Sequence, residues 1–280
     1  MHHLRWLMKV ITIQDVDKKN IKWGRILFFL TFFIQSSFAG PLKIALLDTG
    51  FCPELLKTNK FIKIHAPIDL TDSVKLNCAK YSKDNRRFHG QWVLEQFLKE
   101  LKSKREIEIT PFIIFDKNAN QAESYWKKAF LKQADFHLFI TAAGLPYKGK
   151  ANITKKITRP IFVAGATLGK GIRKSSTLWP QVHFNHQQVF TIGSFLEKDQ
   201  VLGSREDYTL LRPKEMKFFF SSGPTKDHFK GSSRAVATAS ARAINHCYEV
   251  ILKSKPLSKC LEKKRILLPL EEGSLKLPTF

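Results

Sequence analysis

The feature that most constrains the fold is the alternation of short apolar runs with amphipathic segments after residue 40. Apolar residues recur at helical spacing between Val93 and Leu101, and segments 121–132 and 233–252 are also predicted helices. The apolar runs, which we predict to be strands, span residues 42–47, 107–115, 136–141, 161–164, 189–193 and 218–220. Strands that alternate with helices predict an α/β fold, with a mostly parallel β-sheet flanked by helices in three layers.

The first 39 residues have the pattern of an export signal. A basic stretch from Lys18 to Arg25 precedes an uncharged apolar run over 26–34, and Ser37-Phe38-Ala39 predicts cleavage before Gly40. The run is shorter than the ~20 residues that a membrane-spanning helix needs, which favours a cleaved signal over an anchor. We therefore expect an exported protein, periplasmic or secreted, with a signal region over 1–39, a main domain over 40–253 and a basic C-terminal tail over 254–280.

The chain is strongly basic, with 47 Lys and Arg against 24 Asp and Glu, a net charge of +23. Without the six basic and two acidic residues of 1–39, a net charge of +19 remains. Such a charge predicts attraction to anionic surfaces such as lipid head groups or glycans. The lysines are scattered, and no RNA-binding or zinc-finger pattern accompanies them, so we expect no dedicated nucleic-acid site.

Four cysteines follow the predicted signal, at Cys52, Cys78, Cys247 and Cys260. An exported protein can keep disulfides, and four cysteines allow three pairings. Proximity in the sequence favours Cys52–Cys78 with Cys247–Cys260 but leaves the other two pairings open. The spacing contains no CxxC or Cys/His cluster of the kind that binds zinc.

Three polar residues stand at junctions where an α/β fold exposes side chains. Asp48 follows the first predicted strand, His89 precedes the first predicted helix, and Ser233 begins the alanine-rich helix. A serine hydroxyl becomes a nucleophile when an imidazole takes its proton, and a buried carboxylate orients that imidazole. Taken singly, Asp48 could cap a turn, His89 could be a surface residue and Ser233 could cap its helix. Taken together, they predict a catalytic triad.

The order of these residues resembles that of the subtilisin-like serine peptidases, the subtilases of the S8/S53 type. The resemblance rests on Asp48-Thr49-Gly50, His89-Gly90 and Gly231-Ser232-Ser233-Arg234-Ala235, and it runs from about Lys43 to Ala243. It implies a subtilisin-like fold and a serine endopeptidase that hydrolyses peptide or protein substrates. In that activity Ser233 attacks the carbonyl carbon, His89 acts as base and then acid, and Asp48 orients His89.

Further positions match the family in part. The segment that ends in Thr141, Ala142, Ala143 and Gly144 resembles the strand that pairs with the substrate backbone. Thr167 stands where the family carries the asparagine of the oxyanion hole, so the resemblance implies a weakened donor and weak activity. No cofactor is expected to be required. A structural calcium ion would suit the family at Asp72 and Asp84, although their spacing does not indicate one.

An alternative hypothesis keeps the fold without the activity. Thr167 and Arg234, which stands beside the proposed nucleophile, both depart from the family pattern. A catalytically degenerate subtilase fold would bind anionic envelope components or other proteins through its basic surface.

Overall fold

A computed structural model gives the structure of this chain. It describes residues 40–72, 76–82, 85–146, 157–165, 178–195, 213–224, 227–270 and 273–280. Residues 41–280 form one compact unit. The predicted signal region over 1–39 lies outside the described residues. Within the described ranges, no helix combines the length and the apolar character needed to cross a membrane.

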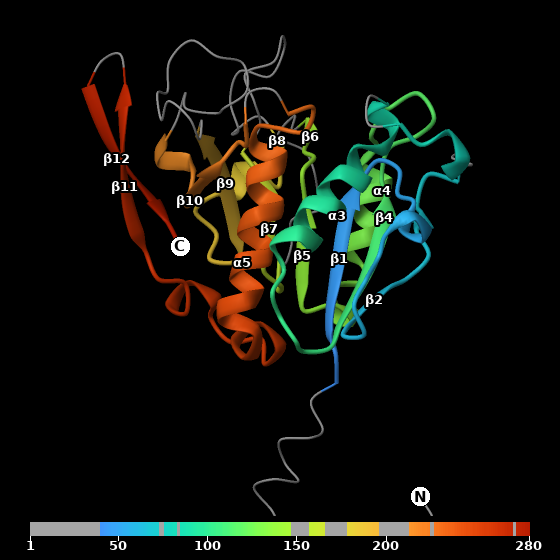
Figure 1. Ribbon diagram of the computed structural model, residues 1–280, viewed down its shortest axis with the longest axis horizontal. Helices are drawn as coiled ribbons and strands as arrows, with labels where there is room; N and C mark the ends of the chain where they lie inside the picture. The colour runs from blue at the N-terminus through green and yellow to red at the C-terminus, as the bar shows by residue number, and fades with distance from the viewer. Residues whose placement is uncertain are drawn as a thin grey trace, which may run out of the picture. The chain divides into compact units, whose positions relative to one another are not determined.

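A parallel sheet forms the centre of this unit (Figure 1). Its strands lie in the order β10, β9, β7, β5, β1, β4, β2, and β3 also pairs with β4. Every recorded pairing in this sheet is parallel. The strands are β1 (Leu42–Asp48), β2 (Ile62–Ile64), β3 (Ile68–Asp69), β4 (Ile107–Ile113), β5 (Leu138–Thr141), β7 (Ile161–Ala164), β9 (Val189–Phe195) and β10 (Phe218–Ser221).

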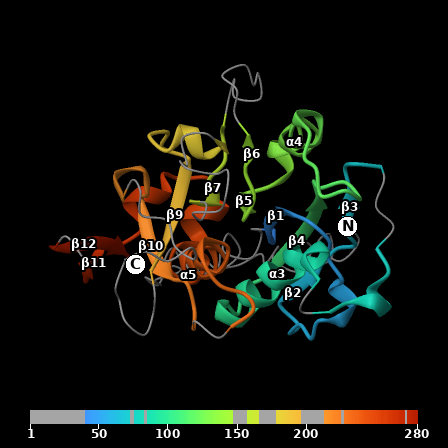
Figure 2. The ribbon, with the colours of Figure 1, turned by 90° about the horizontal axis from the view of Figure 1, so that it is seen from above.

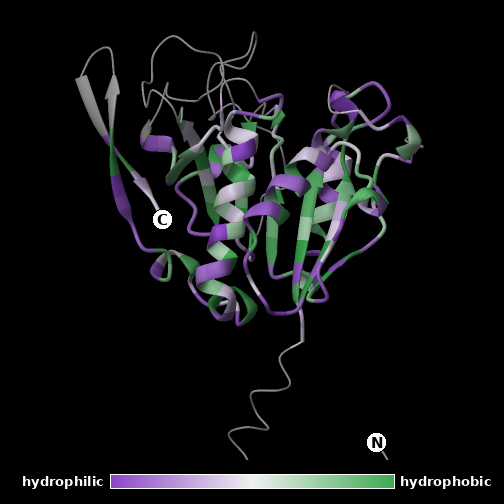
Figure 3. Ribbon diagram, in the orientation of Figure 1, coloured by the Kyte–Doolittle hydropathy of each residue, from purple (hydrophilic) through white to green (hydrophobic). Residues whose placement is uncertain are grey.

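Helices cover both faces of the sheet, as Figures 1 and 2 show from two directions. Along β1, Leu42, Ile44 and Leu46 join the apolar core beneath α3 (His89–Glu100) and α5 (Ser232–Leu252). Ala45 and Leu47 point to the opposite core, which α4 (Glu123–Phe130) covers with Trp126 and Phe130. Figure 3, which is coloured by hydropathy, shows that these central strands are largely hydrophobic. The predicted three-layer α/β architecture is confirmed.

The elements agree with the sequence prediction in their centres and differ at their ends. The helix predicted over 121–132 spans only Glu123–Phe130, and β5 begins at Leu138, two residues later than predicted. Two short strands, β6 (Leu145–Pro146) and β8 (Leu178–Trp179), form a separate antiparallel pair. The 3-10 helices are Pro53–Leu55, Cys78–Lys80, Arg86–Phe88, Gln133–Asp135, Gln181–His183, Pro213–Glu215 and Leu257–Lys259.

The C-terminal segment forms an antiparallel hairpin of β11 (Lys264–Leu270) and β12 (Gly273–Thr279). The last residue, Phe280, is buried, and its ring lies 4.7 Å from that of Phe218 and 4.8 Å from that of Phe220. The hairpin is therefore attached to the edge strand β10 through aromatic packing.

Two disulfides join the four cysteines, Cys52 with Cys78 and Cys247 with Cys260. This is the pairing that sequence proximity favours. The first links the segment after β1 to the segment before α3. The second links the last turns of α5 to the 3-10 helix that follows it.

Candidate active site

Asp48 is the last residue of β1 and lies at the carboxyl edge of the sheet. Its side chain is buried, with 1% exposure. The Oδ1 atom accepts hydrogen bonds from the backbone N–H of Thr49, at 2.7 Å, and from Nδ1 of His89, at 2.8 Å. The carbonyl of Asp48 accepts from the N–H of Ile114, which follows the neighbouring strand β4. Strand pairing and local hydrogen bonds thus fix this carboxylate in one position.

The turn after Asp48 is bonded directly to the start of α3. The Thr49 hydroxyl accepts from the N–H of Gly90, and Gly50 exchanges backbone hydrogen bonds with Arg87 and Gln91. A Cβ atom at Gly90 would lie 2.7 Å from the Phe51 ring and 2.9 Å from Cβ of Asp48. Glycine is therefore the residue that allows the start of α3 to approach the end of β1.

His89 sits between the carboxylate and a cluster of aromatic rings. Its ring contacts Trp92 and Phe229 edge-on, with centroid distances of 5.8 and 5.7 Å. The side chain keeps 26% exposure, so a ligand can reach it. Burial opposes the charged imidazolium, but the charge of Asp48 and its hydrogen bond raise the pKa of His89 above the ordinary 6.5. The bond at Nδ1 leaves Nε2 as the ring nitrogen available to another group.

Ser233 lies in the first turn of α5, which packs against α3 (Figure 1). The Nε2 atom of Gln96 donates to the Thr238 hydroxyl at 3.0 Å, across 142 positions. The ion pair of Arg242 with Glu100 has the same offset. The constant offset shows that the two helices run in the same direction. The ring of His89 lies 5.7 Å from that of Phe229, which precedes Ser233 by four positions.

The Ser233 side chain is half-buried. Among the described residues, no hydrogen bond joins its hydroxyl to His89, and none satisfies its backbone N–H. The first turn of a helix leaves such N–H groups without partners inside the helix. Gly231 precedes this turn at a φ of 80°, a conformation that favours glycine. The site therefore presents an unused donor beside an unbonded hydroxyl.

Arg234 turns away from this hydroxyl into the loop before α5. Its guanidinium donates to the Asp227 carboxylate and to the carbonyl of Phe229. The side chain has 13% exposure. Burial opposes ionisation of Asp227, but the hydrogen bond and charge of Arg234 lower the pKa of that carboxyl. Gly223, at a φ of 86°, leaves room for the arginine stem, because a Cβ there would lie 2.6 Å from Arg234 Cδ. Arg234 thus ties the loop that carries Phe229 to α5.

The predicted substrate-binding segment runs from the end of β5 into the following turn. Thr141 is buried, and its hydroxyl accepts from the N–H of Ala143. The carbonyls of Ala143 and Gly144 accept from the side-chain amides of Gln181 and Gln121. A substrate backbone would therefore pair through the remaining groups near Ala142, or through the second lone pair of these carbonyls.

Gln181 was not singled out by the sequence, yet it joins two strand ends. Its Nε2 atom donates to the carbonyl of Ala143 at 3.2 Å and to that of Ala164 at 2.9 Å. Ala164 ends β7, which precedes the segment that contains Thr167. Thr167 lies outside the described residues. Gln181 follows Trp179-Pro180, whose peptide bond is cis. This local sequence does not predict which residues the buried Gln181 side chain will bond to.

Of the two aspartates predicted as calcium ligands, the structure describes one. Asp72 pairs with Lys128 at 3.0 Å, and Asp84 lies outside the described residues. Within the described ranges, Cys52, Glu54 and Cys78 are the one group of three side chains spaced to ligate a metal. The disulfide occupies both sulfur atoms of that group.

Comparison with known proteins supports the fold at the level of structure alone. No family model and no curated protein matches the sequence. A solved structure described as a cold adapted subtilisin-like serine proteinase is similar, with a TM-score of 0.52. The identity is 13%, and the match covers 75% of this chain and 77% of that one. The chain therefore has a subtilisin-like fold.

Proposed function

We propose that this chain is an exported serine endopeptidase that hydrolyses peptide bonds through Asp48, His89 and Ser233. The observation that carries the proposal is the hydrogen bond between Asp48 and His89, whose ring also contacts Phe229 in the segment that leads into α5. A buried carboxylate bonded to the Nδ1 atom of a partly exposed histidine is the arrangement that prepares an imidazole to act as a base.

In the proposed reaction, His89 Nε2 takes the hydroxyl proton of Ser233 while Oγ attacks the scissile carbonyl carbon. The tetrahedral intermediate collapses, and His89 gives the proton to the leaving amine. Water then repeats the sequence on the acyl-enzyme and frees the carboxylic acid and Ser233. Asp48 holds the imidazole and stabilises its charged form. A rotation of the Ser233 side chain on substrate binding would close its bond to His89, since such bonds are often long in free enzymes.

The developing oxyanion needs donors, and two are proposed. The free N–H of Ser233 is one, and the partial positive charge of the α5 N-terminus supports it. The Thr167 side chain is the other, on the family resemblance. Gln181 would act as a positioning residue, because it holds the ends of β5 and β7 together. The substrate backbone would lie along Thr141 to Gly144.

The test is the cleavage of dye-quenched casein by the purified protein from residue 40 onward. We expect cleavage by the wild type, none by Ser233→Ala, and full cleavage by Ser103→Ala, a serine in the segment that follows the C-terminal end of α3. Cleavage that persists in Ser233→Ala, with a folded protein by circular dichroism, would contradict the proposal.

A second candidate function is binding without hydrolysis, in the degenerate form of the same fold. The absence of a bond from Ser233 to His89 among the described residues favours it. A wild type that binds casein or a polyanion tightly, is unaffected by Ser233→Ala and cleaves nothing would support this candidate instead.

A further inference from the structure

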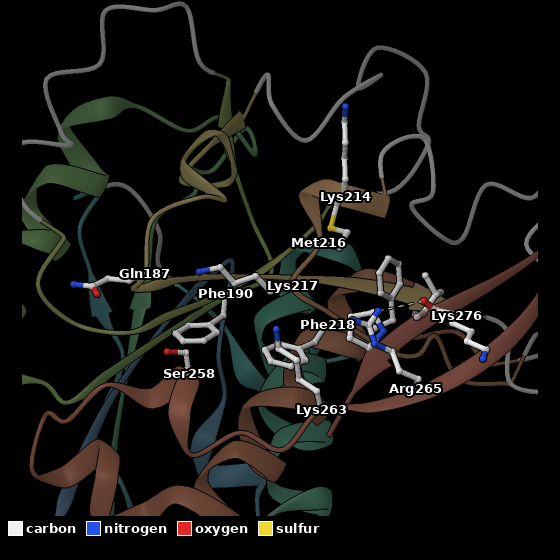
Figure 4. A pocket seen from close by; sticks show the side chains of 13 residues that line it. Gln187, Phe190, Lys214, Met216, Lys217, Phe218, Ser258, Lys263, Arg265 and Lys276 are labelled. Atoms are coloured by element: carbon white, nitrogen blue, oxygen red, sulfur yellow. Dashed lines mark hydrogen bonds between the residues drawn. The ribbon is translucent and has the colours of Figure 1, made fainter.

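A cavity lies between the C-terminal hairpin and the segments around β9 and β10 (Figure 4). Its volume is about 770 Å³. That size is within the range of cavities that hold small organic ligands, about 300–1,000 Å³. None of the residues placed in the proposed catalytic site lines it.

Basic residues from separate parts of the chain line this cavity. They come from the 3-10 helix before β10, from the residue that precedes β10, from the residue that precedes β11 and from both strands of the hairpin. They are Lys214, Lys217, Lys263, Arg265 and Lys276. Among the described residues no carboxylate lines the cavity, and none forms an ion pair with any of the five. Lys217 and Lys263 lie close enough for the charge of Lys263 to act on Lys217, and no carboxylate of the described lining offsets that charge.

Lys217 is a basic residue of this cavity whose pKa is altered by its surroundings. Its ammonium group donates to the carbonyl of His186 at 2.5 Å and lies 4.7 Å from the centre of the Phe190 ring. Burial, together with the positive charge of Lys263, lowers the pKa of Lys217 to about 8. A bound anion would favour the charged form of Lys217 and so offset both effects.

The rest of the lining is apolar. Phe190, Met216, Phe218 and Leu277 contribute to the walls, and Figure 4 shows Phe190 and Phe218 beside the ammonium groups. The stems of the basic residues add further apolar surface. A solvated basic patch would lack such walls, so the lining indicates a ligand with both a charged and an apolar part.

We propose that this cavity binds an amphipathic anion, in which a phosphate or carboxylate group carries an apolar chain. The anionic group pairs with the lysines and Arg265, and the chain lies against Phe190 and Phe218. A free amphiphile and a membrane lipid share this chemistry, and the experiment separates them.

The experiment measures binding of decyl phosphate, below its micelle concentration, by calorimetry on the whole chain from residue 40. We expect one site that binds decyl phosphate at least tenfold more tightly than inorganic phosphate or the uncharged decyl glucoside. Lys263 and Lys276 are both exposed, so K263Q/K276Q should fold. Removing two charged partners should weaken binding about tenfold or more.

The matched control is K57Q/K99Q, which removes the same charge from two exposed positions elsewhere. It should change the affinity less than twofold. An equal loss in both double variants, or equal affinity for inorganic phosphate, or no saturable binding, would overturn the proposal.

Vesicles of phosphatidylcholine with phosphatidylglycerol identify the source. If K263Q/K276Q weakens both vesicle and decyl phosphate binding, the ligand is a membrane lipid. If it weakens decyl phosphate binding alone, the ligand is a free amphiphile. If it weakens neither, the cavity does not bind amphipathic anions.

Discussion

Asp48 and His89, separated by 41 positions in the sequence, meet through a 2.8 Å hydrogen bond between Oδ1 and Nδ1. The bond sets the orientation of the imidazole and stabilises its positive charge. Asp48→Asn keeps the size of the side chain and removes that charge. We predict a fall in turnover of about 10⁴-fold, the size of effect known for the orienting carboxylate of such a triad.

The same variant should lower the pKa of His89, because burial still opposes the charged ring while the carboxylate no longer favours it. Nitrogen-15 NMR of the imidazole measures this pKa. Asp72→Asn, which removes an exposed carboxylate, should leave both turnover and the His89 pKa unchanged.

The raised pKa of His89 also predicts how stability depends on pH. Folded protein holds the proton more tightly than unfolded protein, in which the pKa is about 6.5. The contribution of protonated His89 to stability is therefore complete below about pH 6.5, and it is lost as the pH rises through the folded-state value. Urea unfolding of wild type and His89→Gln should differ more at about pH 5 than at about pH 9, across the range in which histidine titrates. A difference that does not change with pH would contradict the assigned pKa shift.

The pH dependence of catalysis should run in the opposite direction to that of the His89 contribution to stability. Since the neutral imidazole is the base, kcat/KM of the wild type should rise with pH through the His89 pKa, which lies above 6.5.

Gly90 is predicted to tolerate no side chain. An alanine Cβ would overlap the Phe51 ring and approach Cβ of Asp48, so Gly90→Ala should destabilise the fold by about 1–3 kcal/mol, as overpacking does. It should also displace His89 and reduce activity. Gly40→Ala is the control, because a Cβ at Gly40 meets nothing within 4 Å. Equal urea midpoints for the two variants would show that α3 does not need the close approach at Gly90.

Arg234 is predicted to hold the loop before α5. Arg234→Met keeps much of the stem but removes the bonds to Asp227 and to the Phe229 carbonyl. We expect a loss of about 1–3 kcal/mol in the free energy of unfolding, typical for hydrogen bonds that involve a charged group. Arg242→Met, on the same helix, breaks a partly exposed 3.8 Å ion pair with Glu100 and a cation–π contact with Phe220, and should cost about 1 kcal/mol or less. A smaller effect at Arg234 than at Arg242 would mean that its bonds do not hold the loop.

Much of the fold could be predicted because its long elements carry strong local patterns. The buried run of β1 and the helical spacing in α3 and α5 are visible without knowledge of their neighbours. The strand β2, over Ile62–Ile64, is too short for a pattern, and sheet pairing with β4 produces it. The sequence predicts only a basic tail where the hairpin of β11 and β12 forms. Leu275 and Leu277 alternate with Lys276 and Pro278, which is a strand signal that two prolines obscure.

In the candidate site, likewise, the sequence predicts some residues but not the contacts that position them. Asp48, His89 and Ser233 could be selected because a family resemblance orders them along the chain. The bond of Thr49 to Gly90, the contact of Phe229 with His89 and the two bonds of Gln181 join residues far apart in sequence. Such contacts depend on the packing of whole elements, so local composition does not reveal them.

The most direct test of the central claim is covalent labelling of the folded protein with a fluorophosphonate, followed by mass spectrometry of its peptides. An activated serine reacts with this probe, whereas an ordinary hydroxyl does not. We predict a label on Ser233 in the wild type, none in Ser233→Ala or His89→Ala, and full labelling in Ser258→Ala. Folded wild-type protein that takes up no probe, or a label that remains after Ser233→Ala, would contradict the account.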